Sequence, residues 1–275
     1  MRAINQPGRT TGDRTRITRG LLIFLTLTSA VLAAGCNQTG DSWERIQKDG
    51  VLRIGIDPTF PPFAVDREGL LEGIDVDLSR TLADEMGLEP QFSYFGYDGL
   101  YDALTTGQVD VLVSALVITP ERTKEIAYTT PYFDAGLVFV MPRDHAGGTS
   151  INELENLTLS VELGALGHVE ALEQQRQFDN LTVQTHNSAA DALTAVMTGE
   201  ADIALVDHVS ARFFLKEVAA GDSDLVMFPD PTNSEPYAIA IRIEDRILLT
   251  ELNEALDRMR TSGRLNDIID IHLGP

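Results

Sequence analysis

The chain has 275 residues and a formal net charge of −21, with 42 acidic and 21 basic residues. A surface this acidic repels nucleic acids and anionic lipid headgroups, so we exclude both as partners. The single cysteine excludes an intramolecular disulfide and a thiolate metal cluster, and the five histidines lack metal-ligand spacing. We therefore expect neither a metal nor a cofactor.

Residues 1–35 have the pattern of a secretory signal peptide. Five arginines precede an apolar core at residues 21–32, and the small residues Ala33, Ala34 and Gly35 follow it. The apolar core is too short for a comfortable membrane span. Cleavage after residue 35 leaves 16 basic and 41 acidic residues, a net charge of −25, because five arginines and one aspartate are removed.

Cys36 directly follows these small residues, an arrangement that resembles the lipobox of bacterial lipoproteins. The resemblance implies that the Cys36 thiol carries a diacylglyceryl group and that residues 36–44 are a lipidated cysteine and a tether. Acyl chains of this kind hold a protein on a membrane surface. We expect an exported protein, lipid-anchored at the outer face of the cytoplasmic membrane or in the periplasm. The alternative is an ordinary secreted protein with an incidental cysteine.

Strand and helix patterns alternate through the first half of the chain. Apolar runs predict strands at 51–56 and 109–113. Amphipathic helices are predicted at 74–86, where apolar residues recur every four positions, and at 97–106. The first strand ends at Asp57, and the second breaks at Ser114 and Ala115. This alternation is typical of a parallel α/β sheet.

The second strand leads into a short helix that ends near Arg122. Pro120 fits the first helical turn, with Thr119 as the cap. This arrangement brings a hydroxyl, free backbone amides and a guanidinium to one place. A guanidinium can bind both oxygens of a carboxylate, so Arg122 is a candidate carboxylate ligand. The alternative is an arginine on a solvated surface.

A weak internal repeat suggests two lobes built alike. Residues 101–110 and 195–202 both run from a helix through Thr-Gly and a polar residue to an Asp before an apolar strand. Extended segments at 136–141 and 228–236 are expected to cross between the lobes. The predicted fold class is α/β, with two lobes, each a mostly parallel sheet flanked by helices, joined by a two-stranded hinge. We expect lobe 1 at 45–138 plus 235–275, and lobe 2 at 139–234.

Ligands of open parallel sheets bind beyond the carboxyl ends of the strands. The residues expected there are Asp57, Ser114, Arg122 and Asp207, with the aromatic residues Phe60 and Tyr97 nearby. Arg122 would complement the carboxylate of a zwitterion and Asp207 its ammonium group. Asp207 could instead cap the helix that begins near Val209, and the two aromatic residues could belong to the core.

A set of motifs follows in order along the chain from Gly50 to Gly274, at 50–55 with Asp57, 60–63, 73–78, 97–100, 109–122 and 130–133. In these motifs the chain resembles the amino-acid-type (family 3) substrate-binding proteins of bacterial ABC transporters. The resemblance implies two α/β lobes that close on a ligand and present it to a membrane permease. It also implies that Arg122 holds the α-carboxylate, that Asp207 holds the α-ammonium, and that Phe60 and Tyr97 sandwich the side chain. Asp57 lies where some members contact a cationic or polar side chain.

The chain departs from the family pattern at two positions. Val117 and Leu166 stand where family members often carry hydroxyl residues that help to bind the ligand. Backbone amides at Val117 and Leu166 could take over, the latter at a helix N-terminus. The complete set of expected ligand contacts is Asp57, Phe60, Tyr97, Ser114, Ala115, Val117, Arg122, Leu166 and Asp207.

The expected function is the substrate-binding component of an ABC importer, a monomer without enzyme activity that captures a small zwitterion, above all a polar amino acid. Its expected partners are that amino acid and an ABC permease. One alternative is a periplasmic dehydratase-like enzyme on the same fold, with Glu162 or Glu170 as the acid–base carboxylate. Another is a sensor or binding module for a compatible solute.

Overall fold

The computed structural model describes residues 41–144, 154–219, 224–228 and 232–274. The expected signal peptide at 1–35 and the lipidation site Cys36 lie outside these residues. Within them, no helix combines the length and the apolar character needed to cross a membrane.

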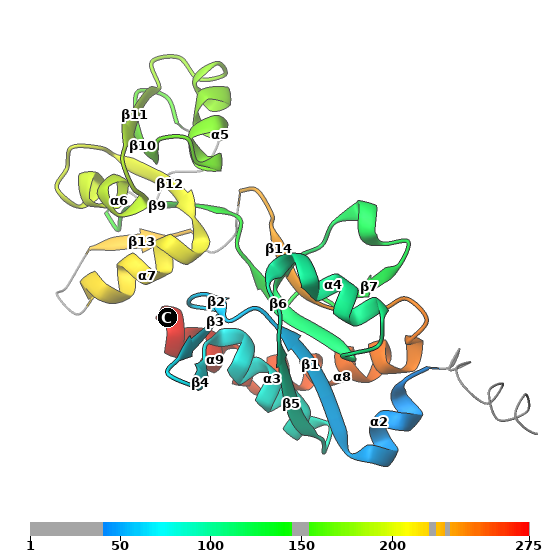
Figure 1. Ribbon diagram of the computed structural model, residues 1–275. Coiled ribbons are helices and arrows are strands. Elements are labelled where there is room, and N and C mark those ends of the chain that lie inside the picture. Colours follow the sequence, from blue (N-terminus) through cyan, green and yellow to red (C-terminus); the bar gives the residue numbers. More distant parts are fainter. Residues whose placement is uncertain (1–40, 145–153, 220–223, 229–231, 275) are drawn as a thin grey trace, which may run out of the picture. The chain divides into compact units, whose positions relative to one another are not determined.

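The first of two large sheets has the strand order β5-β1-β6-β14-β7, and β8 also pairs with β14 (Figure 1). Strand β1 is parallel to its neighbours β5 and β6, whereas β14 is antiparallel to β6, β7 and β8. The strands are β1 (Val51–Ile56), β5 (Glu89–Tyr94), β6 (Val111–Val117), β7 (Ile126–Tyr128), β8 (Phe133–Asp134) and β14 (Pro236–Arg242). A small antiparallel sheet follows β1 in the chain and contains β2 (Thr59–Phe60), β3 (Ala64–Arg67) and β4 (Leu70–Glu72).

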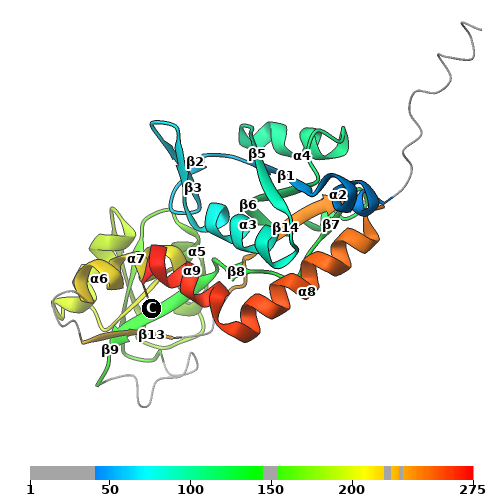
Figure 2. The ribbon, with the colours of Figure 1, turned by 90° about the horizontal axis from the view of Figure 1, so that it is seen from below.

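Helices cover both faces of the first sheet, and the sheet and these helices together form lobe 1. The helices α3, α8 and α9 pack against one another (Figure 2) and share a core with β1, β6 and β14. The opposite face of β6 packs against α4 through a second apolar cluster. The helices of this lobe are α2 (Trp43–Asp49), α3 (Ile74–Glu85), α4 (Tyr97–Thr105), α8 (Arg246–Ser262) and α9 (Arg264–Leu273), with the 3-10 helix η1 (Pro120–Arg122). The helices expected at 74–86 and 97–106 are therefore confirmed to within one residue.

The second large sheet, with its helices, forms lobe 2 and has the strand order β11-β10-β12-β9-β13. Alternate residues of β9 enter two cores, Val138 and Val140 on the side of α6 and Phe139 on the side of Leu159 and Ala171. The elements are β9 (Leu137–Pro142), β10 (Thr158–Glu162), α5 (Leu166–Gln175), β11 (Thr182–His186), α6 (Ala189–Met197), β12 (Ile203–Asp207), α7 (His208–Ala219) and β13 (Leu225–Met227).

The internal repeat has a common structural cause in the two lobes. The Asp110 carboxylate accepts the backbone N–H of Arg53 at 3.1 Å, and the Asp110 N–H donates to the Arg53 carbonyl oxygen at 2.8 Å. Asp202 makes the same two bonds to Thr158, at 2.7 and 3.0 Å. In each lobe, this aspartate extends the pairing between two parallel strands by one residue.

Two segments connect the sheets, and Asp134 joins one to the other. Its Oδ1 accepts the backbone N–H groups of Gly136 and Glu235, and its Oδ2 accepts the Ser234 hydroxyl at 2.6 Å. A Cβ atom on Gly136 would lie 1.6 Å from the Asn233 carbonyl oxygen, so glycine permits this close approach of the two segments. His208 of α7 contacts Asp134 as well, because its Nδ1–H donates to the Asp134 carbonyl oxygen at 2.7 Å. The two connecting segments are thus tied together by side chains as well as backbone.

Two local expectations require correction. The strand expected at 109–113 runs from Val111 to Val117 and continues through Ser114 and Ala115 as a bulge, with a φ of +45° at Ala115. Thr119 precedes η1 but makes no side-chain capping bond, since its hydroxyl lies 3.5 Å from the Tyr128 hydroxyl instead. Pro120 occupies the first turn as expected.

Candidate functional site

The parallel strands β1 and β6 bring Asp57 and Ser114 into contact. The Asp57 N–H donates to the Ser114 hydroxyl oxygen at 3.1 Å, and both residues are buried. Asp57 Oδ1 accepts the backbone N–H and the hydroxyl of Thr59, at 3.1 and 2.7 Å. The pairing of these two expected contact residues follows from the rule that parallel strands end at the same edge of a sheet.

Arg122 lies exposed at the end of η1, and its guanidinium covers the ring of Tyr101. The guanidinium carbon is 3.9 Å from the ring centre, which is a close cation–π contact. Among the described residues, Arg122 makes no ion pair and no side-chain hydrogen bond. The Tyr101 hydroxyl lies 3.3 Å from the Tyr128 hydroxyl, which in turn lies near Thr119. Tyr101 is thereby fixed beneath the guanidinium, and burial raises the pKa of its hydroxyl above the ordinary value.

Phe60 and Tyr97 are exposed rather than part of the core, with 50% and 55% of their surface accessible. Phe60 ends β2 and stacks on Phe63, with ring centres 5.7 Å apart and an angle of 11° between the rings. Phe63 is buried and packs edge-on against Tyr237 at 5.2 Å. Tyr97 is the first residue of α4, one helical turn before Tyr101. Two aromatic faces of lobe 1 are therefore free for contact with a ligand.

In lobe 2, Leu166 and Asp207 line one small hollow of about 70 Å³ at the ends of β10 and β12. Asp207 Oδ1 accepts the N–H of Ser210 at 2.8 Å, which is the bond of an N-cap for α7. Leu166 begins α5, whose first N–H groups have no partner within the helix. A Cβ on Gly167 would lie 2.5 Å from the Leu205 carbonyl oxygen, so glycine lets α5 begin directly against β12.

The hollow in lobe 2 has an acidic lining. Its charged residues are Glu162, Asp207 and Glu235. Three carboxylates around one small space attract a cation. Glu162 and Glu235 are absent from the expected contact set, although Glu162 ends β10 and could have been found by the strand-end rule.

His208 lies directly after Asp207 and stacks on Phe133, with ring centres 5.0 Å apart. Burial lowers the pKa of His208 below its ordinary value. The carbonyl oxygen of Asp134 accepts the Nδ1–H of His208, a contact that opposes the effect of burial on the pKa and fixes the orientation of the ring. The lowered pKa disfavours a positive charge on His208 beside Asp207.

The remaining expected residues lie on β6. Ala115 is buried in the bulge, and Val117 is half-buried opposite Tyr237 at the end of the strand. The structure thus joins Asp57 to Ser114 by a hydrogen bond and places Leu166 beside Asp207 around one hollow. It does not gather all nine expected residues around a single hollow within the described part of the chain.

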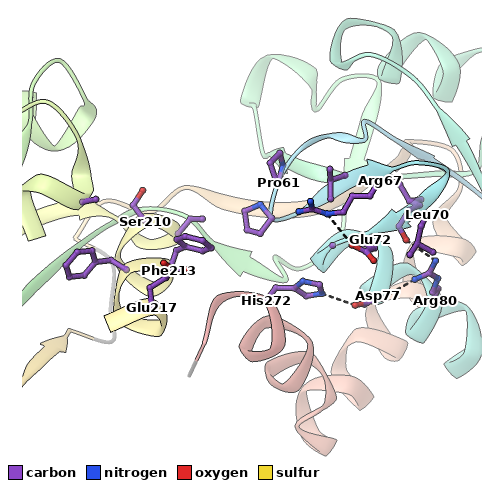
Figure 3. A pocket seen from close by; sticks show the side chains of 17 residues that line it. Pro61, Arg67, Leu70, Glu72, Asp77, Arg80, Ser210, Phe213, Glu217 and His272 are labelled. Atoms are coloured by element: carbon purple, nitrogen blue, oxygen red, sulfur yellow. Dashed lines mark hydrogen bonds and ion pairs between the residues drawn. The ribbon is translucent and has the colours of Figure 1, made fainter. Parts of the chain in front are cut away.

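A larger hollow of about 1030 Å³ contains none of the nine residues (Figure 3). Residues of β3, β4, α3 and α7 line it, together with His272 at the end of α9. Several of its charged side chains pair with one another, as Figure 3 shows for Asp77, which contacts Arg80 at 3.2 Å and His272 at 2.8 Å. By size alone, this hollow would be the better candidate for the ligand site. Because several of its charged side chains already pair with one another, it matches a zwitterion less well than the expected residues do.

Comparison with known proteins agrees with the motifs. Residues 52–275 match the model of the bacterial extracellular solute-binding proteins, family 3. The chain is 28% identical over 222 residues to a probable histidine-binding protein of Neisseria gonorrhoeae, covering 79% of this chain and 81% of that protein. It is 28% identical over 230 residues to the L-arginine-binding protein of Pseudomonas aeruginosa, covering 81% and 87% of the two chains.

A solved structure shares the fold. It is the L-cystine solute receptor of Neisseria gonorrhoeae in the unliganded open conformation, with a TM-score of 0.74 and 21% identity over 86% of this chain and 97% of that chain. At this identity the likeness shows the two-lobed periplasmic-binding-protein architecture and nothing about the ligand.

Proposed function

Because the chain belongs to the bacterial extracellular solute-binding proteins of family 3, we propose that it captures an amino acid and delivers it to an ABC permease. The observation that carries this proposal is the guanidinium of Arg122, held against Tyr101 without an acidic partner among the described residues. In a chain with 42 acidic residues, an arginine oriented in this way remains available for the carboxylate of a ligand.

The α-ammonium group of the ligand would bind at the acidic hollow of lobe 2. Asp207 caps α7 with Oδ1, which leaves Oδ2 for a ligand, and Glu162 lines the same space. Leu166 and Gly167 would offer the free N–H groups at the start of α5 to a carboxylate oxygen. Contacts from both lobes would then stabilise a closed form of the protein, which is the form that a permease would recognise.

The charge around these residues favours a ligand whose side chain is not acidic. The proposed set contains one guanidinium, that of Arg122, and four carboxylates, those of Asp57, Glu162, Asp207 and Glu235. A second carboxylate on the ligand would be repelled by this excess, whereas a neutral polar or cationic side chain would not. Phe60 and Tyr97 supply aromatic faces that accept either kind. We therefore propose a polar amino acid as the ligand.

The proposal extends to the lipid anchor, the oligomeric state and the lobe boundaries of the protein. Lipidation of Cys36 would keep the protein at the membrane that holds the permease. The chain would act as a monomer, with the lobe boundaries expected above. The side-chain sandwich of Phe60 and Tyr97 and the backbone-amide contact of Val117 belong to it as well.

Thermal unfolding of the purified protein with each of the 20 standard amino acids tests the proposal. A ligand present at a hundred times its dissociation constant adds about 2.7 kcal/mol to the free energy of unfolding, a shift of several degrees. We expect a shift with at least one polar or cationic amino acid and none with aspartate or glutamate. Failure of every amino acid, at low and at high salt, would contradict the proposal.

The same samples test the dehydratase alternative. Glu162 lines the hollow beside Asp207, whereas Glu170 accepts a hydrogen bond from Gln174 at 2.8 Å. If Glu162 were an acid–base catalyst, a bound compound would be consumed over hours and its dehydrated product would accumulate. A binding protein returns the compound unchanged, and chromatography of the recovered ligand distinguishes the two outcomes.

A further inference from the structure

A bulge in β6 sets the backbone of two proposed contact residues, Ser114 and Ala115. Leu112 pairs with Ala240 and Leu116 with Ala238, so one residue of β14 faces three residues of β6 between these pairs. Ala115 adopts a φ of +45°, a left-handed conformation that a residue with a Cβ atom rarely takes. Such a conformation persists only where the surrounding structure holds it in place.

A chain of two buried hydrogen bonds holds this bulge from inside lobe 1. The Ala115 N–H, which points away from the β6–β14 ladder, donates to the Tyr132 hydroxyl oxygen at 3.1 Å. The Tyr132 hydroxyl donates to Asp75 Oδ1 at 2.6 Å. The three residues come from β6, from the segment before β8 and from the first turn of α3, and each is at least nine-tenths buried.

Burial of the Asp75 carboxyl group is energetically unfavourable, and filling the core does not require a carboxyl group. The Asp75 side chain is fully buried, and Oδ2 has no hydrogen-bond partner among the described residues. No described cation forms an ion pair with it, in contrast to Asp110, which contacts three arginines. Burial raises the pKa of the Asp75 carboxyl to about 7. An apolar side chain would avoid these costs but would leave the Tyr132 hydroxyl without its acceptor.

We propose that Asp75 and Tyr132 are positioning residues for ligand binding, which hold Ser114 and Ala115 in the bulged conformation that the ligand contacts. Asp75 fixes the direction of the Tyr132 hydroxyl, and the hydroxyl oxygen fixes the Ala115 amide. On the other side of the bulge, the Ser114 hydroxyl accepts the Asp57 N–H, so the bulge is held from both sides. This inference rests on the proposed function, because it assumes that Ser114 and Ala115 face a ligand.

The test compares ligand affinity with stability in four variants. The probe is the standard amino acid that gives the wild-type protein its largest thermal shift, titrated by calorimetry. Tyr132→Phe keeps the ring and removes the hydroxyl, and Asp75→Ala removes the acceptor; we expect each to lower the affinity about ten-fold. Asp75→Asn retains an acceptor oxygen and should recover most of the affinity that Asp75→Ala loses. Leu252→Ala, a buried change in α8, should destabilise the lobe and leave the affinity within about two-fold.

A second readout follows the bulge itself. In Tyr132→Phe, the amide of Ala115 should exchange with solvent faster relative to that of Leu112, which remains in the ladder. Leu252→Ala should leave this ratio unchanged. The inference is overturned if Tyr132→Phe binds the probe as tightly as wild type, or if Leu252→Ala weakens binding to the same degree. If no amino acid shifts the wild-type protein, the proposed function fails. If wild type binds the probe and Tyr132→Phe binds it equally well, this inference fails and the proposed function stands.

Discussion

The guanidinium carbon of Arg122 lies 3.9 Å from the centre of the Tyr101 ring. Arg122 is exposed and Tyr101 is 7% exposed, so an exposed guanidinium contacts the face of a buried ring. The contact restricts the guanidinium before any ligand arrives, and restricting a side chain in advance reduces the entropy that binding must otherwise overcome.

Replacing Tyr101 separates the role of the ring from that of its hydroxyl. Tyr101→Leu removes the aromatic face and should weaken amino-acid binding about five-fold, in line with a cation–π contact of about 1 kcal/mol. Tyr101→Phe keeps the face and loses only the contact with Tyr128, so its affinity should stay within about two-fold of wild type. Calorimetric titration measures both. Equal losses in the two variants would show that the hydroxyl, rather than the ring, orients Arg122.

Asp207 caps α7 and is proposed to bind the ammonium group of the ligand, and one pair of variants distinguishes these two roles. Asparagine is as good an N-cap as aspartate, so Asp207→Asn should preserve stability and lose affinity for amino acids through the missing charge. Asp207→Ala should lose the same affinity and, in addition, about 1 kcal/mol of the free energy of unfolding. Deaminated analogues should bind equally to wild type and Asp207→Asn. A stability loss without any change in affinity would make Asp207 a helix cap only.

Asp75 should make the protein less stable as the pH rises. Its pKa is about 7 in the folded protein, against 3.8 as the ordinary value, so the folded state holds a proton that the unfolded state has lost between these two values. The free energy of unfolding therefore falls through this window, by on the order of 4 kcal/mol, and is constant above it. In Asp75→Asn this contribution is absent. Denaturation from pH 4 to pH 8 should show wild type losing stability relative to Asp75→Asn, and a pH-independent difference would contradict the assignment.

The contribution of Asp110 to the free energy of unfolding should change with pH in the opposite direction. Asp110 is fully buried and contacts Arg45, Arg53 and Arg242; hydrogen bonds from Arg53 and Arg45 outweigh the effect of burial and lower its pKa. Its stabilising contribution is present above the unfolded-state pKa and is lost as the pH falls through the folded-state value.

Asp202 is the matched control for Asp110, because it makes the same backbone bonds in lobe 2 and has no ion pair among the described residues. Asp110→Ala should cost about 3–5 kcal/mol, since it leaves three arginines around a buried site. Asp202→Ala should cost about 1–2 kcal/mol, the value of its lost hydrogen bond. Chemical denaturation at pH 7 measures both, and similar costs would mean that the arginines contribute nothing through Asp110.

The elements and the fold class followed from local patterns, because apolar spacing determines which faces of α3, α4 and α8 are buried. Strand-end placement likewise located Asp57 and Ser114 correctly relative to each other. The bulge at Ala115 could not be predicted in this way, since it depends on Tyr132 and Asp75, which are distant in the chain. The support of Arg122 by Tyr101 was missed for a similar reason, although Tyr97 and Tyr101 lie one helical turn apart.

Asp207 shows where two predictions from the sequence were both reasonable. The helix that follows it begins at His208, and the capping bond to Ser210 is present. Capping uses one carboxylate oxygen, so it does not conflict with ligand binding by the other. From the sequence, helix capping and ligand binding by Asp207 were alternatives, because the sequence does not show that capping occupies only one carboxylate oxygen.

The proposed function depends above all on one contact, that of the Arg122 guanidinium with the carboxylate of an amino acid. The most direct measurement is calorimetric titration of wild type, Arg122→Ala and Arg264→Ala with the amino acid that gives the largest thermal shift. Arg264 is an exposed arginine that pairs with Glu85 at 2.6 Å and serves as the control. We expect affinity to fall at least about 100-fold in Arg122→Ala, the effect of losing a charge-assisted pair of hydrogen bonds, and to stay unchanged in Arg264→Ala. An affinity of Arg122→Ala equal to that of wild type would contradict the proposed contact.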